Sequence, residues 1–111
     1  MNWRFVDTGF NTGKFNMDFD LRLVSQLRTD EAILRFYRWE PFCISLGANQ
    51  SFNSVNSKKA EQAGIDIVKR PTGGRAILHA EELTYSVIHP VTSEQSPKTL
   101  YKEINLSLKK R

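Results

Sequence analysis

The residues best suited to chemistry gather in residues 69–79, which read Lys-Arg-Pro-Thr-Gly-Gly-Arg-Ala-Ile-Leu-His. The Gly73-Gly74 pair permits positive φ angles and close approach of a ligand, because neither residue carries a Cβ atom. Arg70 and Arg75 flank the pair, and guanidinium groups beside main-chain N–H groups suit a phosphate, a carboxylate or a carbonyl that develops negative charge. The spacing of a Walker A or dinucleotide-binding loop is absent. An anion site and an ordinary hairpin turn are therefore both open interpretations.

One cysteine and two histidines are the other reactive side chains. Cys43 stands among bulky apolar neighbours, which is typical of a core thiol, and no base lies near it in the sequence, so we do not predict a nucleophile there. His79 fits either a ligand contact or a hydrogen-bonded structural role. His89, beside Pro90, is interpreted as a surface residue. The sequence predicts no metal site.

A helix is expected from about residue 15 to residue 28, with Asn16 and Asp20 one turn apart at the border of its apolar stripe. In one interpretation Asn16 caps the helix and Asp20 satisfies a backbone or arginine group. In the other, both side chains lie at the edge of a pocket.

The remaining pattern alternates between strand-like and helical segments. Strands are expected at residues 3–7, 32–39, 42–47, 65–69, 76–79 and 83–88, and further helices at 58–63 and from 96 onward. Gly64 is expected to end its helix in a left-handed conformation. Strands 32–39 and 42–47 are expected to be antiparallel neighbours, and Ala80-Glu81-Glu82 to form a hairpin. The pattern predicts a single α+β domain over residues 1–111, with a mixed, mostly antiparallel sheet covered by helices.

The composition limits the function classes without choosing one. The 111 residues carry a net charge of +4, and no stretch is apolar enough to cross a membrane. No secretion signal is recognisable at the start, so a cytoplasmic location is expected. Nucleic-acid binding through the basic residues is a weak alternative, because the aromatic side chains that would stack on bases sit in predicted strand interiors.

Residues 69–79 resemble the signature of the lipoate–protein ligase A and octanoyltransferase family, whose shared form is Arg-Arg-x-x-Gly-Gly followed by His. Other family motifs occur in the same order over nearly the whole chain: Trp3-Arg4-Phe5-x-Asp7, Phe15-Asn16-Met17-x-x-Asp20, Leu34-Arg35-Phe36-Tyr37-x-Trp39-x-Pro41, Ser45-Leu46-Gly47 and Glu82-Leu83-Thr84-Tyr85-Ser86-Val87. The Pro-Thr-Gly-Gly-Arg and Leu-Thr-Tyr-Ser segments are more similar to the octanoyltransferase branch than to the ATP-dependent ligase branch.

The resemblance implies the fold of biotin and lipoate protein ligases, in which a mixed sheet holds a tunnel for a linear acyl chain. It assigns the acyl carboxyl or adenylate end to Arg70, Thr72, Gly73, Gly74, Arg75 and Ala76, with His79 close to the acyl group. It assigns the tunnel wall to Tyr37, Trp39 and Asn16. An apolar tunnel suits an eight-carbon chain, because each buried CH₂ contributes about 0.8 kcal/mol.

The activity implied is transfer of octanoyl or lipoyl groups to a lysine of a lipoyl domain. The donor is an acyl carrier protein thioester in the octanoyltransferase branch, or free lipoate or octanoate with ATP and Mg²⁺ in the ligase branch. The family's essential lysine, and the cysteine of the octanoyltransferases, are expected beyond Arg111, so no catalytic residue is predicted here and the chain alone is expected to be inactive. Two alternatives remain: a subunit completed by a C-terminal partner chain or by self-association, and a non-catalytic remnant.

Overall fold

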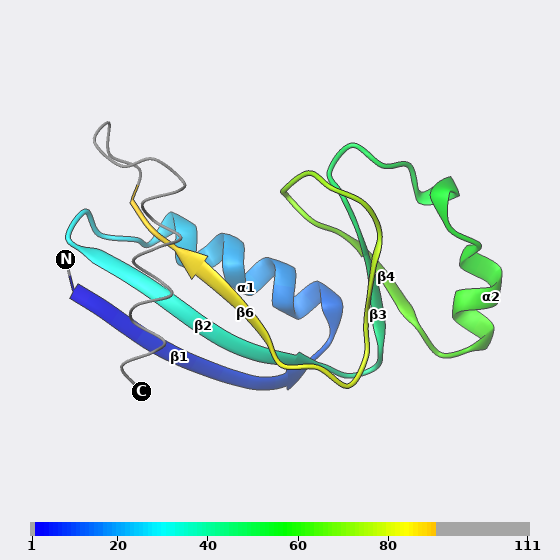
Figure 1. Ribbon diagram of the computed structural model, residues 1–111, viewed down its shortest axis with the longest axis horizontal. Coiled ribbons are helices and arrows are strands. Elements are labelled where there is room, and N and C mark those ends of the chain that lie inside the picture. Colours follow the sequence, from blue (N-terminus) through cyan, green and yellow to red (C-terminus); the bar gives the residue numbers. More distant parts are fainter. Residues whose placement is uncertain (1, 91–111) are drawn as a thin grey trace.

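Two three-stranded sheets lie end to end in the computed structural model, which describes residues 2–90 (Figure 1). The first sheet has the order β1-β2-β6 and the second has the order β4-β3-β5. Both are mixed, since each combines one parallel and one antiparallel pair. The expected α+β class with a mixed sheet and covering helices is confirmed. The expected helix from residue 96 lies outside the described residues.

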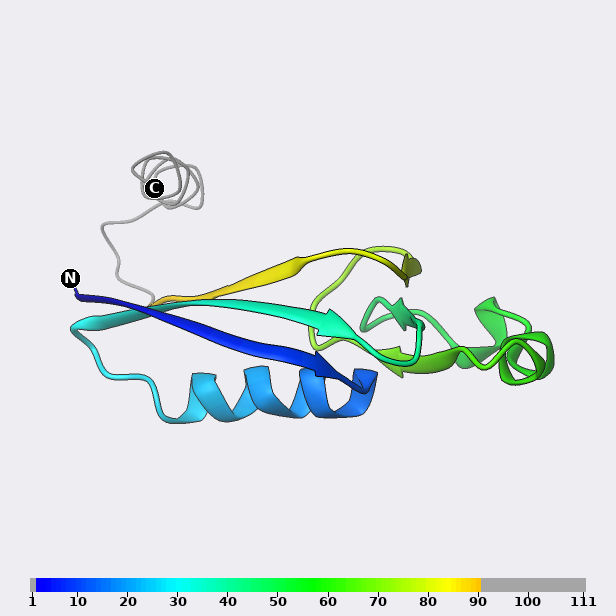
Figure 2. The ribbon, with the colours of Figure 1, turned by 90° about the horizontal axis from the view of Figure 1, so that it is seen from below.

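The first sheet contains β1 (Asn2–Asn11), β2 (Glu31–Trp39) and β6 (Thr84–Ile88), with α1 (Gly13–Ser25) packed across one face (Figure 2). β1 and β2 run parallel because α1 carries the chain back between them, as a crossover helix does. β6 then adds antiparallel to the free side of β2. The face against α1 forms an apolar core around Leu23, Ile33 and Ile88.

The second sheet contains β3 (Cys43–Leu46), β4 (Asp66–Lys69) and β5 (Ile77–His79). Between β3 and β4 the chain forms a short 3₁₀ turn, Phe52–Ser54, and α2 (Ser57–Gln62), which lies at the far end of the molecule (Figure 1). Gly64 follows α2 with a φ of 72°, so the expected left-handed end of this helix is confirmed.

The expected strand pairings were wrong at two places. β2 and β3 are consecutive but belong to different sheets, and so do β5 and β6. Ala80-Glu81-Glu82 is therefore a link between sheets and not a hairpin turn. Turn composition is local, whereas a strand's partner is chosen by long-range packing, and β3 pairs with β4 and β5 instead.

The first strand is longer than expected, because the turn-rich residues Thr8 and Gly9 interrupt the register without ending the strand. Gly9 takes a φ of 67°, which a residue without a Cβ atom adopts at little cost. The helix that follows begins at Gly13, and its cap is Thr12, whose side chain accepts the Phe15 N–H at 3.2 Å. The interpretation of Asn16 as the cap was wrong.

Among residues 2–90, no helix is long and apolar enough to cross a membrane.

Candidate functional site

The loop between β4 and β5 is organised around the Arg70 guanidinium. Its Nη1 donates to the main-chain oxygen and the Oγ of Ser45 at 2.8 and 2.7 Å, and its Nη2 donates to the carbonyls of Gly73 and Arg75 at 3.0 Å each. One planar cation thus holds both ends of the Gly73-Gly74 turn to β3. Residues 71–76 are exposed, so the main chain of the turn is accessible from solvent.

Gly74 has a φ of 102°, which confirms the expected positive φ. The turn lies so close to β3 that a Cβ atom added at Gly47 would overlap the Gly74 carbonyl oxygen. Thr72 takes part in the same contact, since its carbonyl accepts the Ala48 N–H at 2.8 Å. Glycine at position 47 is therefore required by packing, whereas a Cβ atom at Gly73 would meet nothing within 4 Å.

His79 lies under this loop and is buried. Its Nε2 is 2.8 Å from Ser45 Oγ, and its Nδ1 is 3.2 Å from the Glu82 carboxylate. The imidazole ring stacks on Trp39, with centroids 4.1 Å apart and planes inclined by 10°. His79 and the Arg70 loop share Ser45 as a common hydrogen-bond partner, so the predicted carboxyl-binding residues do form one structural unit.

Tyr37 and Trp39 share a buried cluster with Cys43 at the junction of the two sheets. Burial and the nearby Asp20 carboxylate raise the pKa of the Tyr37 phenol to about 12, so it is neutral at physiological pH. The Arg35 guanidinium stacks over the Tyr37 ring at 3.9 Å. These aromatic residues give the junction an apolar wall beside His79.

Asn16, the third residue expected in the tunnel wall, is fully buried at a different point of the junction. Its Oδ1 accepts Arg35 Nη2 at 2.7 Å, and its Nδ2 donates to the carbonyls of Asn11 and Arg38. Asp20 accepts from both Arg35 and Ser86 at 2.9 Å, which confirms the interpretation that Asp20 satisfies an arginine. Asn16 is thus joined to Tyr37 through Arg35, and its part in a tunnel remains a prediction.

Cys43 is a core residue, as expected. It is fully buried between the start of α1 and β4, close to Gly13 and Val68. Burial and the neighbouring Asp66 raise the pKa of its thiol to about 12. The thiol is therefore protonated at neutral pH, and the thiolate is the reactive form.

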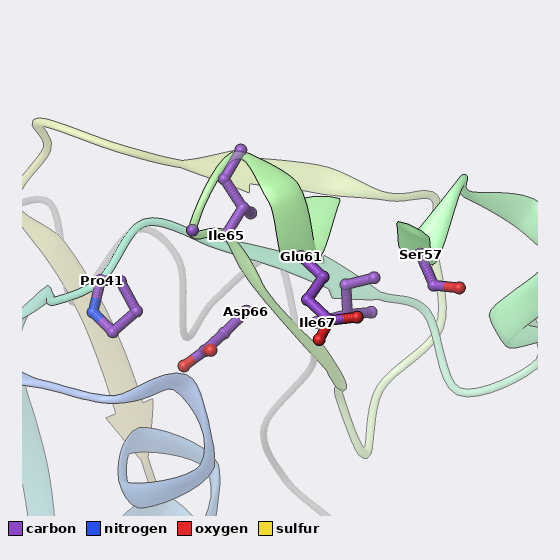
Figure 3. Close-up of a pocket in the computed structure, with 7 residues that line it drawn as sticks. Pro41, Ser57, Glu61, Ile65, Asp66 and Ile67 are labelled. Atoms are coloured by element: carbon purple, nitrogen blue, oxygen red, sulfur yellow. The ribbon is translucent and has the colours of Figure 1, made fainter. Parts of the chain in front are cut away.

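Two surface pockets share Pro41 in their lining. One, of about 460 Å³, is lined by Pro41, Ser57, Glu61, Gly64, Ile65, Asp66 and Ile67 (Figure 3). The other, of about 370 Å³, is lined by Phe10, Trp39, Glu40, Pro41, Phe42 and Glu81. Each carries two carboxylates, which disfavour an anionic ligand head, and only the second includes a predicted site residue.

Three polar residues of the site were not singled out from the sequence: Ser45, Glu82 and Thr84. Trp39 Nε1 donates to Thr84 Oγ1 at 2.8 Å, and Thr84 Oγ1 donates to the Glu82 carboxylate at 2.8 Å. Each residue does lie within a motif that the sequence contains, Ser-Leu-Gly or Glu-Leu-Thr-Tyr. The spacing of three residues between His79 and Glu82 is the signal that points to Glu82.

The loop, the buried histidine and the mixed sheets agree with a match over residues 12–108 to the lipoyl protein ligase A/B catalytic domain. The chain belongs to this family. Relatives in the family include the octanoyltransferase LipM of Staphylococcus epidermidis, 37% identical over 96% of this chain and 41% of the relative. The LipM of Exiguobacterium sibiricum is 43% identical over 88% of this chain and 37% of the relative. This family member therefore spans about two fifths of the length of these relatives.

Solved ligases share the fold. The putative lipoate protein ligase Ta0514 of T. acidophilum, with bound lipoic acid, superposes with a TM-score of 0.78 at 23% identity, over 95% of this chain and 44% of that one. A lipoate-protein ligase A bound with ATP gives 0.80 at 23% identity, over 95% and 43%. A structure of the bi-partite ligase of Thermoplasma acidophilum and its E2 lipoyl domain gives 0.76 at 24% identity, over 95% and 42%.

Proposed function

We propose that this chain forms the acyl-binding part of an enzyme that transfers octanoyl or lipoyl groups to a lysine of lipoyl domains. The observation that carries the proposal is the Arg70 loop, which presents an accessible Gly73-Gly74 main chain directly above the buried His79–Trp39 stack. A carboxyl head meets the cation and main-chain amides of the loop, while the alkyl chain meets the aromatic wall.

The distribution of charge and apolar surface supports this orientation of the ligand, with its carboxyl head at the loop and its alkyl chain at the aromatic residues. Four N–H groups of Arg70 are spent on protein acceptors, so the guanidinium mainly shapes the loop and acts on a ligand through its positive charge. The exposed Thr72, Arg75 and Ala76 extend this basic, amide-rich surface. The side chains of Tyr37 and Trp39 are aromatic rings that carry one polar group each. Their surface is mostly apolar, which suits a hydrocarbon chain.

The names of the relatives favour the octanoyltransferase branch. In that branch we propose that an acyl carrier protein donates the octanoyl group and that a lipoyl domain accepts it. In the ligase branch the substrates are lipoate with ATP and Mg²⁺. We propose that this enzyme acts in the cytoplasm.

Calorimetry with octanoate and lipoate tests the proposal through Arg70→Ala. We expect affinity to fall about ten- to hundredfold, because the variant removes the positive charge and the bonds that hold the Gly73-Gly74 turn, a combined loss of about 1.5 to 3 kcal/mol. Lys58→Ala is the matched control, because it removes the same charge from exposed α2 and should leave affinity unchanged. Equal affinities for both variants and the unaltered chain would remove Arg70 from the site.

A second candidate is a subunit that binds the acyl group only together with a second copy of this chain. It is favoured by exposed apolar side chains on and beside β5 and β6: Ile77, Leu78, Leu83 and Tyr85 are each about half exposed. Light scattering of the purified chain distinguishes the candidates. A subunit of this kind should self-associate with rising concentration, and Leu78→Ser with Leu83→Ser should suppress the association. A monomer at all concentrations contradicts the second candidate.

A further inference from the structure

A single chain of hydrogen bonds runs through the junction of the two sheets. It starts at Trp39 on β2, passes through Thr84 on β6 and Glu82 in the link, and reaches His79 on β5. From His79 it continues to Ser45 on β3 and ends at Arg70 in the loop. The stacking of His79 on Trp39 closes its first part into a ring.

The chemistry of the end groups determines the direction of the bonds nearest each end. At one end, Trp39 Nε1 can only donate a hydrogen bond, and Thr84 Oγ1 accepts it. The Thr84 hydroxyl then donates its own hydrogen bond to the Glu82 carboxylate. A carboxylate can only accept. The His79 Nδ1 that faces Glu82 at 3.2 Å must therefore carry a proton.

The other end of the chain is compatible with the same tautomer. Arg70 Nη1 can only donate, so Ser45 Oγ accepts it at 2.7 Å and has one hydroxyl proton left to give. His79 Nε2 lies 2.8 Å from Ser45 Oγ, within reach of that hydroxyl proton. A neutral His79 with its proton on Nδ1 satisfies both ends of the chain, because its Nε2 then accepts from Ser45.

We propose that Glu82 is a positioning residue, which fixes His79 as its Nδ1–H tautomer and so couples the His79–Trp39 stack to the Arg70 loop through Ser45. In this state both ring nitrogens of His79 are engaged within the protein. The ring then presents a flat surface to the acyl site and has no lone pair with which to act as a general base. The consequence for acyl binding rests on the proposed function, whereas the tautomer does not.

A nucleophilic Ser-His-Glu triad is the competing interpretation of Ser45, His79 and Glu82. The surroundings of Ser45 argue against it. Arg70 already occupies one lone pair of the Ser45 Oγ, and the serine is fully buried in this structure. The order of donors thus makes Ser45 a link in the chain and not an attacking group.

The test is nitrogen NMR of the 111-residue chain with ¹⁵N-labelled histidine, in which the shifts of a ring nitrogen distinguish its protonated from its unprotonated form. His89→Asn removes the only other histidine and identifies the His79 signals. We expect His79 with a protonated Nδ1 and an unprotonated Nε2 at pH 8. A protonated Nε2 in this spectrum overturns the proposal without any variant at Glu82.

Glu82→Ala and Glu81→Ala form a matched pair, because Glu81 is the adjacent exposed carboxylate and has no place in the chain. We expect Glu82→Ala to populate the Nε2–H tautomer, to shift the backbone amides of residues 70–75 and to weaken octanoate binding about tenfold. Glu81→Ala should change none of these. An unchanged tautomer in folded Glu82→Ala overturns the proposal. If the tautomer changes as expected but neither octanoate nor lipoate binds any variant, the proposed function fails and the positioning role stands.

Discussion

Two arginines show how environment decides what one residue type does. Arg70 is half-buried and its guanidinium holds an exposed loop. Arg35 is fully buried, and its guanidinium is satisfied by Thr8, Asn16 and Asp20 and stacked between Phe19 and Tyr37. Such a group is costly to desolvate, and here each of its three nitrogens donates at least one hydrogen bond. Arg35 therefore fixes α1 against β2 and orients Tyr37.

We predict that Arg35→Ala lowers the free energy of unfolding by about 3 to 5 kcal/mol, because it leaves the Asp20 carboxylate without its buried partner. Arg4→Ala is the matched control: the Arg4–Glu31 ion pair is 3.1 Å long but its Arg4 side chain is 57% exposed. Its loss should cost at most about 1 kcal/mol. Urea denaturation measures both, and similar losses would show that Arg35 is not an anchor of the fold.

Because of Cys43, the free energy of unfolding should depend on pH in the alkaline range. The folded state holds the pKa of this thiol near 12, against an ordinary value of 9.0. Between these values the unfolded chain releases a proton that the folded chain keeps, so the free energy of unfolding should fall as pH rises from about 9 toward about 12. Tyr37 adds to the fall above its ordinary value of 10.0.

Cys43→Ala should make this alkaline decline shallower, whatever it does to stability at neutral pH. Denaturation midpoints at several pH values from 7 to 11 supply the measurement. An identical slope in the variant would mean that the thiol ionises alike in both states.

At the scale of elements, the sequence predicts the features that depend on neighbouring residues, such as glycine conformations and strand positions. Gly64 and Gly74 take the positive φ angles expected of them, and most strands lie within a few residues of their expected positions. Thr8-Gly9 misleads because a bulge and a turn have the same composition. The hairpin expected at residues 80–82 was wrong because β5 pairs with β3 and β6 pairs with β2, a choice of partners that turn patterns do not show.

The close approach of the loop to β3 gives a sharp prediction. Gly47→Ala should lower the free energy of unfolding by more than 1 kcal/mol, since its Cβ atom would overlap the Gly74 carbonyl and the main chain must move. Gly73→Ala should be nearly neutral in stability, because nothing lies within 4 Å of the added atom and its φ is not positive. Equal stabilities of the two variants in urea would contradict this packing of the loop on β3.

At the scale of the molecule, the site lies at the junction of the two sheets. β2 ends and β6 begins where the second sheet brings His79 and Ser45, so no single motif contains the site. The sequence predicted Arg70, the glycine pair and His79, because the resemblance includes them in one segment. It did not predict how Ser45, Glu82 and Thr84 connect them, since these residues meet only after two sheets have formed. The half-exposed apolar side chains of β5 and β6 lie at the same junction.

The central claim is that an acyl chain binds between the Arg70 loop and the aromatic wall. The most direct measurement is mapping of ¹⁵N–¹H shifts in the 111-residue chain during titration with octanoate, and with propionate as a short-chain control. Octanoate should perturb the amides of residues 70–79 together with the Trp39 indole, and propionate only the loop and far more weakly, because each CH₂ adds about 0.8 kcal/mol of burial. Equal responses to both acids, or octanoate shifts confined to the pocket of Glu61 and Asp66, would contradict the account.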